Sequence, residues 1–274
     1  MKNKILIFIF TLIIFFNFIN LSMAATEPTI KNQYVYSKKP MSYVAVNKRY
    51  TCWVSHRPAK LQFSPTDIVV KDLQTGKERK VANYDVVEDV GFPVMNEKYA
   101  AWTVSKYTKG VFDSKIVLYD LAKQKIIRQI TSKDLFKNKK ANFDFSRISM
   151  DEKFIVWIHK YSISKGREKG NIYAYDLNKK LFKVVTQLSP QILKEEYFPH
   201  IIHGYVSWPD YQDRKSLIKI KNLTNHFQKS IFVPGKATEM ATNGHVIVWR
   251  EGKYGELNDG KLMPSYILRM LKMG

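Results

Sequence analysis

Cysteine, acidic residues and long apolar runs are all scarce in this sequence of 274 residues. The single cysteine, Cys52, excludes an internal disulfide, so burial of apolar surface must stabilise the fold. Cys52 stands beside Trp53 in an apolar stretch, which favours a buried structural residue over a reactive thiol. No Gly-x-Ser-x-Gly sequence occurs, which excludes the nucleophile elbow of an α/β-hydrolase.

The scarcity of acids leaves a strong positive charge, because 45 Lys and Arg face 24 Asp and Glu, a formal net charge of +21. Such an excess concerns partners and solubility rather than fold, and it favours an anionic partner. Nucleic acid is not expected, because no recognition motif of the usual kinds is present. The candidate polyanion-binding residues lie in predicted loops: Lys137, Lys139, Lys140, Lys165, Arg167 and Lys169. The alternative is a solvated rim that keeps edge strands from aggregating.

The long apolar run lies at the N-terminus, over residues 5–19. It follows two early lysines and precedes the small residues of Ser22-Met-Ala24. This order is typical of a secretory signal peptide over residues 1–24, and an uncleaved membrane anchor is the alternative. Residues 25–274 are then expected to form a single extracytoplasmic domain.

The five tryptophans occupy the same place in a phrase that recurs about every 50 residues, a period typical of repeat architectures. Each ends an apolar stretch that resembles Phe154-Ile-Val-Trp157. Such a stretch predicts a strand covered on both faces. The tryptophans are Trp53, Trp102, Trp157, Trp208 and Trp249.

A second strand is predicted after each tryptophan strand, with apolar residues alternating as in Ile172-Tyr-Ala-Tyr-Asp-Leu177. Its Asp-Leu step leads into a turn, in which Asp bonds the backbone two residues on and Gly76 supplies a positive φ. The structural aspartates of this step are Asp72, Asp120 and Asp176. The last copy has Met270 at the same place. A third strand follows the turn and a short fourth piece precedes each tryptophan strand, while a single helical turn is predicted within residues 188–196.

Four-stranded antiparallel units of this period predict an all-β fold, a β-propeller of about five four-stranded blades. The units lie near residues 37–83, 84–132, 143–187, 197–235 and 236–274. The last unit lacks its fourth strand, and we expect residues 28–36 to supply it and so close the ring. A larger ring cut short, or an incomplete ring that dimerises, is the alternative.

The repeated phrases, together with Val206-Ser-Trp-Pro-Asp-Tyr211, resemble the blade repeat of the TolB-like propellers and bacterial cell-surface proteins. The same repeat occurs in the propellers of prolyl oligopeptidase-type enzymes. The resemblance covers about residues 37–272 and implies a bacterial envelope protein. The family's Ser-Pro-Asp-Gly turn is found here only as Ser149-Met-Asp-Glu152, and the chain has no room for the N-terminal domain of TolB.

Several carboxylates and histidines are candidates for catalysis or metal binding, and structural uses are favoured for them. The carboxylates expected on the innermost strands or at their ends are Glu88, Asp89, Asp144 and Asp151, but they do not recur in register as a glycosidase would require. His56 and His159 are predicted in loops on the same rim, and His200 and His203 on opposite faces of a strand, so a metal site is not favoured. Asp210 and Asp213 are assigned to a turn rather than to calcium.

The sequence therefore predicts an exported, non-catalytic binding or scaffold module of the bacterial envelope, with no cofactor. The partner is expected to be an envelope protein or an anionic polymer. Two other functions remain open. One is a glycan-processing hydrolase that uses the central pocket, and the other is a basic surface protein that binds anionic wall polymer.

Overall fold

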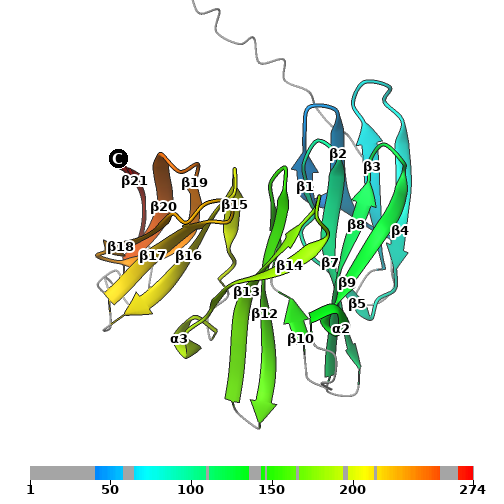
Figure 1. Ribbon diagram of the computed structural model, residues 1–274. Helices are drawn as coiled ribbons and strands as arrows, with labels where there is room; N and C mark the ends of the chain where they lie inside the picture. The colour runs from blue at the N-terminus through cyan, green and yellow to red at the C-terminus, as the bar shows by residue number, and fades with distance from the viewer. Residues whose placement is uncertain are drawn as a thin grey trace, which may run out of the picture. The chain divides into compact units, whose positions relative to one another are not determined.

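The computed structural model describes residues 41–57, 65–108, 111–135, 143–145, 147–164, 167–193, 197–212, 215–253 and 265–273 (Figure 1). Nearly all of these residues lie in or between β-strands, so the predicted all-β class is confirmed. The described residues also form two helices of a single turn, α2 (Ser132–Leu135) and α3 (Pro190–Leu193). The helical turn predicted within residues 188–196 is α3, whereas α2 was not predicted.

Five antiparallel sheets follow one another along the described chain (Figure 1). The first has the order β1-β2-β3-β4, made of β1 (Met41–Val46), β2 (Tyr50–His56), β3 (Thr66–Asp72) and β4 (Glu78–Tyr84). The second has the order β5-β7-β8-β9, made of β5 (Glu88–Val90), β7 (Tyr99–Thr108), β8 (Val111–Asp120) and β9 (Lys125–Thr131). A short additional strand, β6 (Val94–Met95), also pairs with β7.

The third sheet repeats this plan, with the order β10-β12-β13-β14 and with β11 also paired to β12. Its strands are β10 (Phe143–Phe145), β11 (Ser149–Met150), β12 (Phe154–Ser164), β13 (Arg167–Asp176) and β14 (Leu181–Gln187). The fourth sheet is made of β15 (His200–Ile202), β16 (Tyr205–Gln212), β17 (Lys215–Asn222) and β18 (Gln228–Val233), in that order. The fifth has three described strands, β19 (Lys236–Thr242), β20 (Val246–Lys253) and β21 (Ser265–Lys272).

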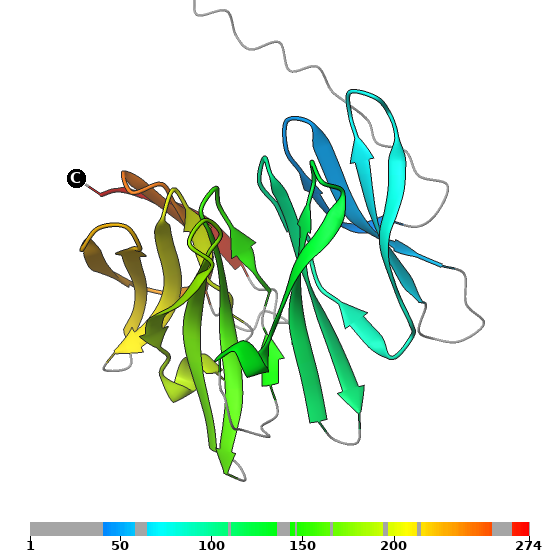
Figure 2. The same ribbon diagram turned by 45° about the vertical axis from the view of Figure 1, so that its right-hand side comes forward.

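Successive sheets pack on one another through apolar side chains. Figure 2 shows the sheets of the ribbon in a second view. In β7, Trp102 packs with residues of the first sheet, whereas its neighbour Ala101 packs with residues of the third. In β8, Tyr119 likewise packs with residues of the first sheet and Leu118 with residues of the third. This division follows from the period of two along a strand, which sends adjacent side chains to opposite faces. The apolar character of β7 is thereby explained, because both of its faces are covered.

The same packing continues toward the C-terminus. Residues of the third and fourth sheets share a cluster that includes Ala174 and Trp208. Residues of the fourth and fifth sheets share a cluster that includes Ile220 and Trp249. Each of the last four tryptophans therefore packs with residues of the sheet before it. In the first four sheets, the third residue of the repeated second-strand phrase packs with residues of the sheet after it; these residues are Val70, Leu118, Ala174 and Ile220.

The five sheets confirm the prediction of about five blades. The predicted signal peptide over residues 1–24 and the predicted closing strand over residues 28–36 lie outside the described residues, and both stay predictions. Within the described part of the chain, no helix has the length and apolar character needed to cross a membrane.

Candidate functional site

Two kinds of turn are repeated from sheet to sheet. The first kind directly precedes a tryptophan strand and follows a strand at the inner edge of its sheet: β1, β6, β11 or β19. In it, a side-chain oxygen of Asn47, Asn96, Asp151 or Asn243 accepts hydrogen bonds from the backbone N–H groups two and three residues on, at 2.6–3.0 Å. Of these four residues, only Asp151 was predicted from the sequence to lie in such a turn. The asparagines are a readable signal, because Asn and Asp accept such bonds in the same way.

These turns also connect consecutive sheets. The Nδ2 atom of Asn47 donates to the carbonyl oxygen of Asn96 at 2.6 Å, and Nδ2 of Asn96 donates to the carbonyl oxygen of Asp151 at 2.8 Å. The backbone N–H of Gly204 donates to Oδ2 of Asp151 at 2.6 Å. A line of hydrogen bonds therefore runs through the turns of the first four sheets, and it positions their innermost strands relative to one another.

The second kind of turn follows the second strand of each unit. Its side-chain oxygen accepts backbone N–H groups at 2.8–3.3 Å, and it belongs to Asp72, Asp120, Asp176 or Asn222. Gly76 has a φ of 71° in the first copy, as the sequence predicted. One oxygen of each of these side chains is therefore used by the turn itself.

The last four tryptophans lie in the cores between sheets. Trp53, Trp102 and Trp157 are fully buried, and Trp208 and Trp249 are nearly so. Trp157 stacks on Tyr173 with ring centroids 5.9 Å apart. Their indoles are structural, because large aromatic surfaces stabilise the contact between blades when they are buried.

Aromatic and cationic side chains from four sheets meet beside the innermost strands. Tyr43 of β1 and Phe92, between β5 and β6, have ring centroids 3.7 Å apart. The guanidinium of Arg147, between β10 and β11, lies 3.7 Å from the Phe92 ring and 5.1 Å from the ring of Phe198, which precedes β15. The ring centroids of His200 and Phe198 are 5.3 Å apart. We call these five residues the axial stack; sequence analysis did not identify it.

Two features distinguish the axial stack from a buried core. Tyr43 is 40% exposed and Arg147 is exposed, so the stack reaches solvent. Tyr43 also has a φ of 54°, a left-handed conformation that is strained for an aromatic residue, within an irregularity of the β1–β2 pairing. Strain of this kind persists where the surrounding structure enforces it, and it is concentrated at functional sites.

Three of the carboxylates considered for catalysis have side chains that the structure describes, and they have separate surroundings. Asp151 is buried and serves the turn and the fourth sheet, as described above. Glu88 accepts the backbone N–H of Asp85 at 3.3 Å, and Asp89 is exposed in β5. Asp144 lies in β10. For the described residues, no group of three or more His, Cys, Asp or Glu side chains forms a metal site.

The prediction that His56 and His159 lie in loops was wrong, because the strands extend beyond the tryptophans. His56 ends β2, where its Nε2 lies 2.8 Å from Oγ of Ser42. His159 lies inside β12, fully buried beside the rings of Phe145, Tyr161 and Tyr173. Burial lowers the pKa of His159 to about 4, since the charged imidazolium is poorly solvated there.

Two further expectations need correction. His203 does not share a strand with His200. It lies in the turn after β15, with a φ of 50°, and its Nδ1 is 3.7 Å from Oε2 of the exposed Glu152. Asp210 lies in strand β16 rather than in a turn, and its Oδ2 pairs with Nζ of Lys219 at 2.6 Å. Asp213 lies outside the described residues.

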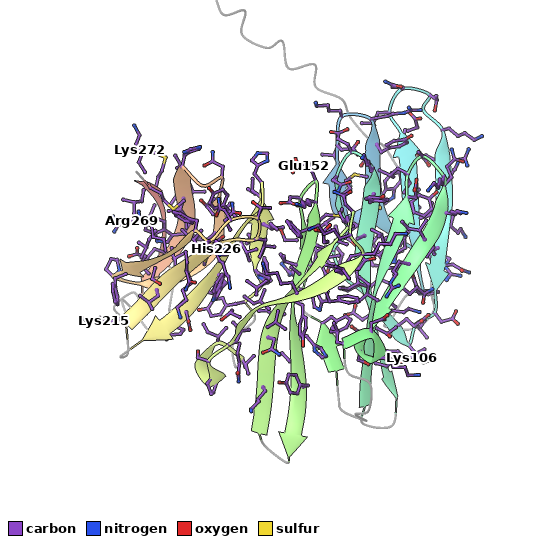
Figure 3. All side chains as sticks on the ribbon, viewed as in Figure 1. Lys106, Glu152, Lys215, His226, Arg269 and Lys272 are labelled. Atoms are coloured by element: carbon purple, nitrogen blue, oxygen red, sulfur yellow. The ribbon has the colours of Figure 1, made fainter. Side chains whose placement is uncertain are left out.

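The predicted polyanion-binding cluster is described only in part. Lys137, Lys139, Lys140 and Lys165 lie outside the described residues, while Arg167 and Lys169 belong to β13 and Lys169 is exposed. Other exposed cations extend from several sheets, including Lys106, Lys215, Arg269 and Lys272 (Figure 3). The positive charge is therefore distributed over strands as well as loops.

Cys52 is buried, and its burial raises the pKa of the thiol to about 12. The thiolate is the nucleophilic form of cysteine. A neutral thiol without solvent access fits a small core residue.

No protein-family model matches the chain, and no curated protein matches it in sequence. Similar solved structures include one from a study of two prolyl endopeptidases, at 14% identity and a TM-score of 0.53 over 82% of this chain and 32% of that one. An oligogalacturonate lyase in complex with manganese is similar at 12% identity and a TM-score of 0.54, over 87% of this chain and 67% of that one. TolB from Acinetobacter baumannii is similar at 14% identity and a TM-score of 0.45, over 86% of this chain and 55% of that one.

This chain therefore spans about half of the TolB chain, at 55%, and about a third of the prolyl endopeptidase chain, at 32%. At such low identity, the similarity concerns the fold and not the activity, the substrate or the family. The five sheets, together with the similarity to the prolyl endopeptidase and oligogalacturonate lyase structures, identify the fold of this chain as a β-propeller.

Proposed function

We propose that this chain is an exported, non-catalytic binding module of a bacterial cell envelope, and that the axial stack contacts its ligand. The observation that carries the proposal is the meeting of Tyr43, Phe92, Arg147 and Phe198, which come from four different sheets. Loops and innermost strands from several units can together form a binding surface that no single unit provides.

The chemistry of the axial stack favours an acidic ligand with apolar faces, such as a segment of anionic wall polymer. Arg147 supplies a permanent charge and a planar fork of donors that suits carboxylate or phosphate groups. Tyr43 and Phe198 supply ring surface at low cost in side-chain entropy. The net charge of +21 adds a long-range attraction for polyanions.

A binding role is also supported by the uses of the carboxylates. Asp151 accepts three backbone N–H groups through its two oxygens, which leaves it poorly suited to transfer protons. Two carboxylates that flank a scissile bond are what glycoside hydrolysis requires. Glu88 and Asp89 are neighbours in β5, and neighbours on a strand point to opposite faces.

The binding proposal is tested by titrating purified wall polymer of the producing bacterium into the full chain and into the Arg147→Ala variant. Arg128→Ala is a matched control, because Arg128 also lies near two rings, Tyr175 and Phe182, both at 5.9 Å, but on the outer strand β9. We expect Arg147→Ala to weaken binding about tenfold or more, as loss of a charge-assisted contact does, and Arg128→Ala to change it less than about twofold.

Equal loss in both variants, or unchanged binding by Arg147→Ala, would contradict a role of the axial stack. Binding should also weaken as salt is raised, because the attraction is electrostatic. Release of shortened polymer during the titration would contradict the non-catalytic part of the proposal and favour a glycan-processing enzyme.

Export is tested separately by fractionating cells and sequencing the N-terminus of the mature protein. We expect a mature chain outside the cytoplasm that begins at Ala25 or Thr26, as the small residues before the cut predict. A cytoplasmic protein that retains residues 1–24 would overturn this part of the proposal.

A further inference from the structure

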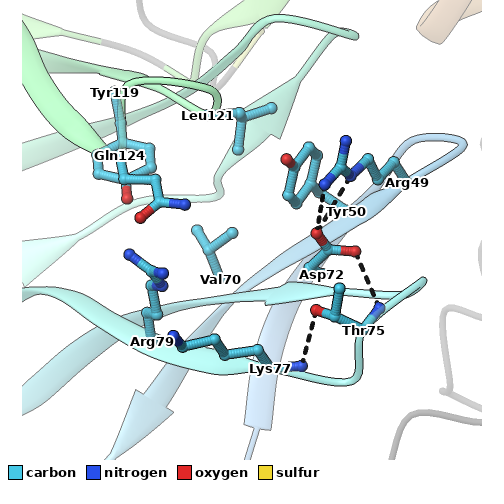
Figure 4. Close-up of a pocket in the computed structure, with 10 residues that line it drawn as sticks. All are labelled: Arg49, Tyr50, Val70, Asp72, Thr75, Lys77, Arg79, Tyr119, Leu121 and Gln124. Carbon is cyan, nitrogen blue, oxygen red and sulfur yellow. Dashed lines mark hydrogen bonds and ion pairs between the residues drawn. The ribbon is translucent and has the colours of Figure 1, made fainter.

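A cavity of about 210 Å³ lies between the β3–β4 turn of the first sheet and the β8–β9 turn of the second (Figure 4). Val70 and Leu121 are its buried apolar residues, and Tyr50 and Tyr119 are its aromatic ones. The remaining lining residues are polar or charged: Arg49, Asp72, Thr75, Lys77, Arg79 and Gln124. We call it the lateral pocket; it shares no residue with the axial stack.

The lateral pocket contains three cations and one carboxylate, and one of the cations is already paired. Nε and Nη2 of Arg49 lie 3.1 and 2.9 Å from Oδ2 of Asp72. The other oxygen of Asp72 accepts the backbone N–H groups of Gln74 and Thr75. The hydrogen bond from Arg49 keeps the pKa of Asp72 below its usual value, so the pair is ionised and neutral overall.

Lys77 and Arg79 therefore retain their positive charges. Among the residues that the structure describes, neither side chain makes a hydrogen bond or an ion pair. Lys77 and Arg79 stand two positions apart at the start of β4, and both line the pocket together with Tyr119 and Gln124 (Figure 4). Two adjacent like charges repel each other, and a bound anion would remove that cost.

The repeat supplies an internal reference for Arg79. In the register of each sheet, Arg79 pairs with Val70 as Arg128 pairs with Leu118 in the next sheet. Both arginines lie near a tyrosine of the following sheet, Tyr119 or Tyr175. Arg128, however, is neutralised by Asp134, with Nη2 and Oδ1 only 2.6 Å apart. The first sheet thus has the same cation without the acid.

We propose that the lateral pocket binds a small phosphate monoester, whose phosphate group takes beside Arg79 the place that the Asp134 carboxylate takes beside Arg128. A phosphate monoester carries a charge of about −2, which matches Lys77 and Arg79 together, whereas a carboxylate or a phosphodiester matches one of them. The guanidinium fork suits phosphate geometry and Lys77 acts as a point charge. The Gln124 amide and the Tyr119 hydroxyl supply further donors.

The size of the lateral pocket supports an ester rather than a free ion. A water molecule takes about 30 Å³ of liquid volume, so a space of this size accommodates a phosphate together with a small organic group. Val70, Leu121 and Tyr50 provide apolar surface for that group. Gln124 has a φ of 56°, as do the equivalent turn residues Gly76 at 71° and Lys180 at 58°, so the repeated turn sets the backbone that presents its side chain.

Isothermal titration of the full chain with three probes tests this assignment. The probes are inorganic phosphate, glycerol 3-phosphate as the monoester, and a glycerol phosphodiester that represents an internal unit of a polymer. We expect glycerol 3-phosphate to bind about tenfold more tightly than the diester, because the second negative charge has its own cation. Equal binding of the monoester and the diester, or no binding of any probe, would overturn the proposal.

Variants locate the binding. Arg79→Gln and Lys77→Gln should each weaken glycerol 3-phosphate by about tenfold, while the matched control Arg128→Gln should change it by less than about twofold. Gln124→Glu, which places a carboxylate in the pocket, should abolish binding and raise the melting temperature, because it imitates the pairing of Arg128 with Asp134. Loss of binding in Arg128→Gln equal to that in Arg79→Gln, or unimpaired binding by Gln124→Glu, would place the site elsewhere and refute the assignment.

Discussion

The third and the fifth sheets carry the same repeat, yet they differ in how their faces are covered. In β13, Ala174 packs with residues of the fourth sheet and is almost fully buried. In β21, the residue at the same repeat position is Leu268, and it is 78% exposed. Met270, at the position of the turn aspartate, is 68% exposed. The repeat thus determines which side chains point toward the next sheet, whereas their burial requires that a sheet be there.

The largest expected effect is a difference between Leu118→Ala and Leu268→Ala, which change the same repeat position. Leu118 is 3% exposed and packs with residues of the third sheet, so its truncation should cost about 2–5 kcal/mol in the free energy of unfolding. Leu268→Ala should cost less than about 0.5 kcal/mol, as exposed substitutions do. Urea unfolding of the two full-length variants measures both values. A comparable loss at Leu268 would break the comparison, by showing that this face is covered in solution.

The second expected effect concerns the residue two places after each tryptophan. In the third sheet this residue is His159, which is buried among aromatic rings. In the fifth sheet it is Glu251, which is also buried but whose Oε2 pairs with Nε of Arg269 at 3.4 Å. The unfolded chain binds a proton at His159 near its ordinary pKa of 6.5, whereas the folded chain does so only near a pKa of about 4. Acid therefore favours unfolding between these values.

The free energy of unfolding should fall by about 3 kcal/mol on account of His159 as the pH goes from 6.5 to 4, since each pKa unit is worth about 1.4 kcal/mol. His159→Gln should lack this part of the pH dependence, and His203→Gln, whose side chain is 66% exposed, should retain it. Urea unfolding at several pH values gives the slopes. Identical slopes in wild type and His159→Gln would contradict the assignment.

A smaller effect separates two turns of the same kind. Asn96 caps its own turn and also donates to the third sheet, whereas the side chain of Asn243 caps its own turn. Replacement by Ala should cost about 1 kcal/mol at Asn243 and about twice that at Asn96, since a further hydrogen bond is lost.

Asn96→Asp refines this test, because it keeps the acceptor oxygen and removes the Nδ2 donor. Its cost should lie between zero and that of Asn96→Ala, as measured by thermal unfolding. Equal costs for Asn96→Ala and Asn243→Ala would mean that the bond between the sheets contributes nothing.

The smallest expected effect is that the Cys52 thiol of the native chain does not react with an alkylating agent. Cys52 is buried in the first sheet against the second, and its pKa of about 12 leaves no thiolate near neutral pH. Iodoacetamide should leave the native chain unmodified at pH 8 and should alkylate it in urea, as mass spectrometry will show. Rapid alkylation of the native protein would indicate that the first sheet opens readily, unlike the interior sheets.

Much of the fold was predictable because it depends on local pattern. The tryptophan strands, the second strands and the Asp72 turn follow from alternation and turn chemistry within a few residues. The strand limits were less predictable, and His159 was placed in a loop because β12 continues well past Trp157. Hydrogen bonding to β13 extends that strand, and nothing in the local sequence marks its end.

The candidate sites were not predictable in the same way. Tyr43, Phe92 and Arg147 are each unremarkable in their own unit, and they form the axial stack only because three sheets lie in register. The lateral pocket depends likewise on Arg79 of one sheet and Gln124 of the next. The inner turns are the exception, because Asn47 and Asn96 stand at the same repeat position and could have been recognised from the sequence.

By itself, the sequence determined the repeating unit, its strands and the direction in which each side chain points, because these follow from backbone geometry and a period of two. The tertiary structure alone decided which charges meet, which aromatic rings stack and which apolar faces stay uncovered. Those outcomes depend on distances between residues that lie tens of positions apart, and only the packing of one sheet on another sets such distances.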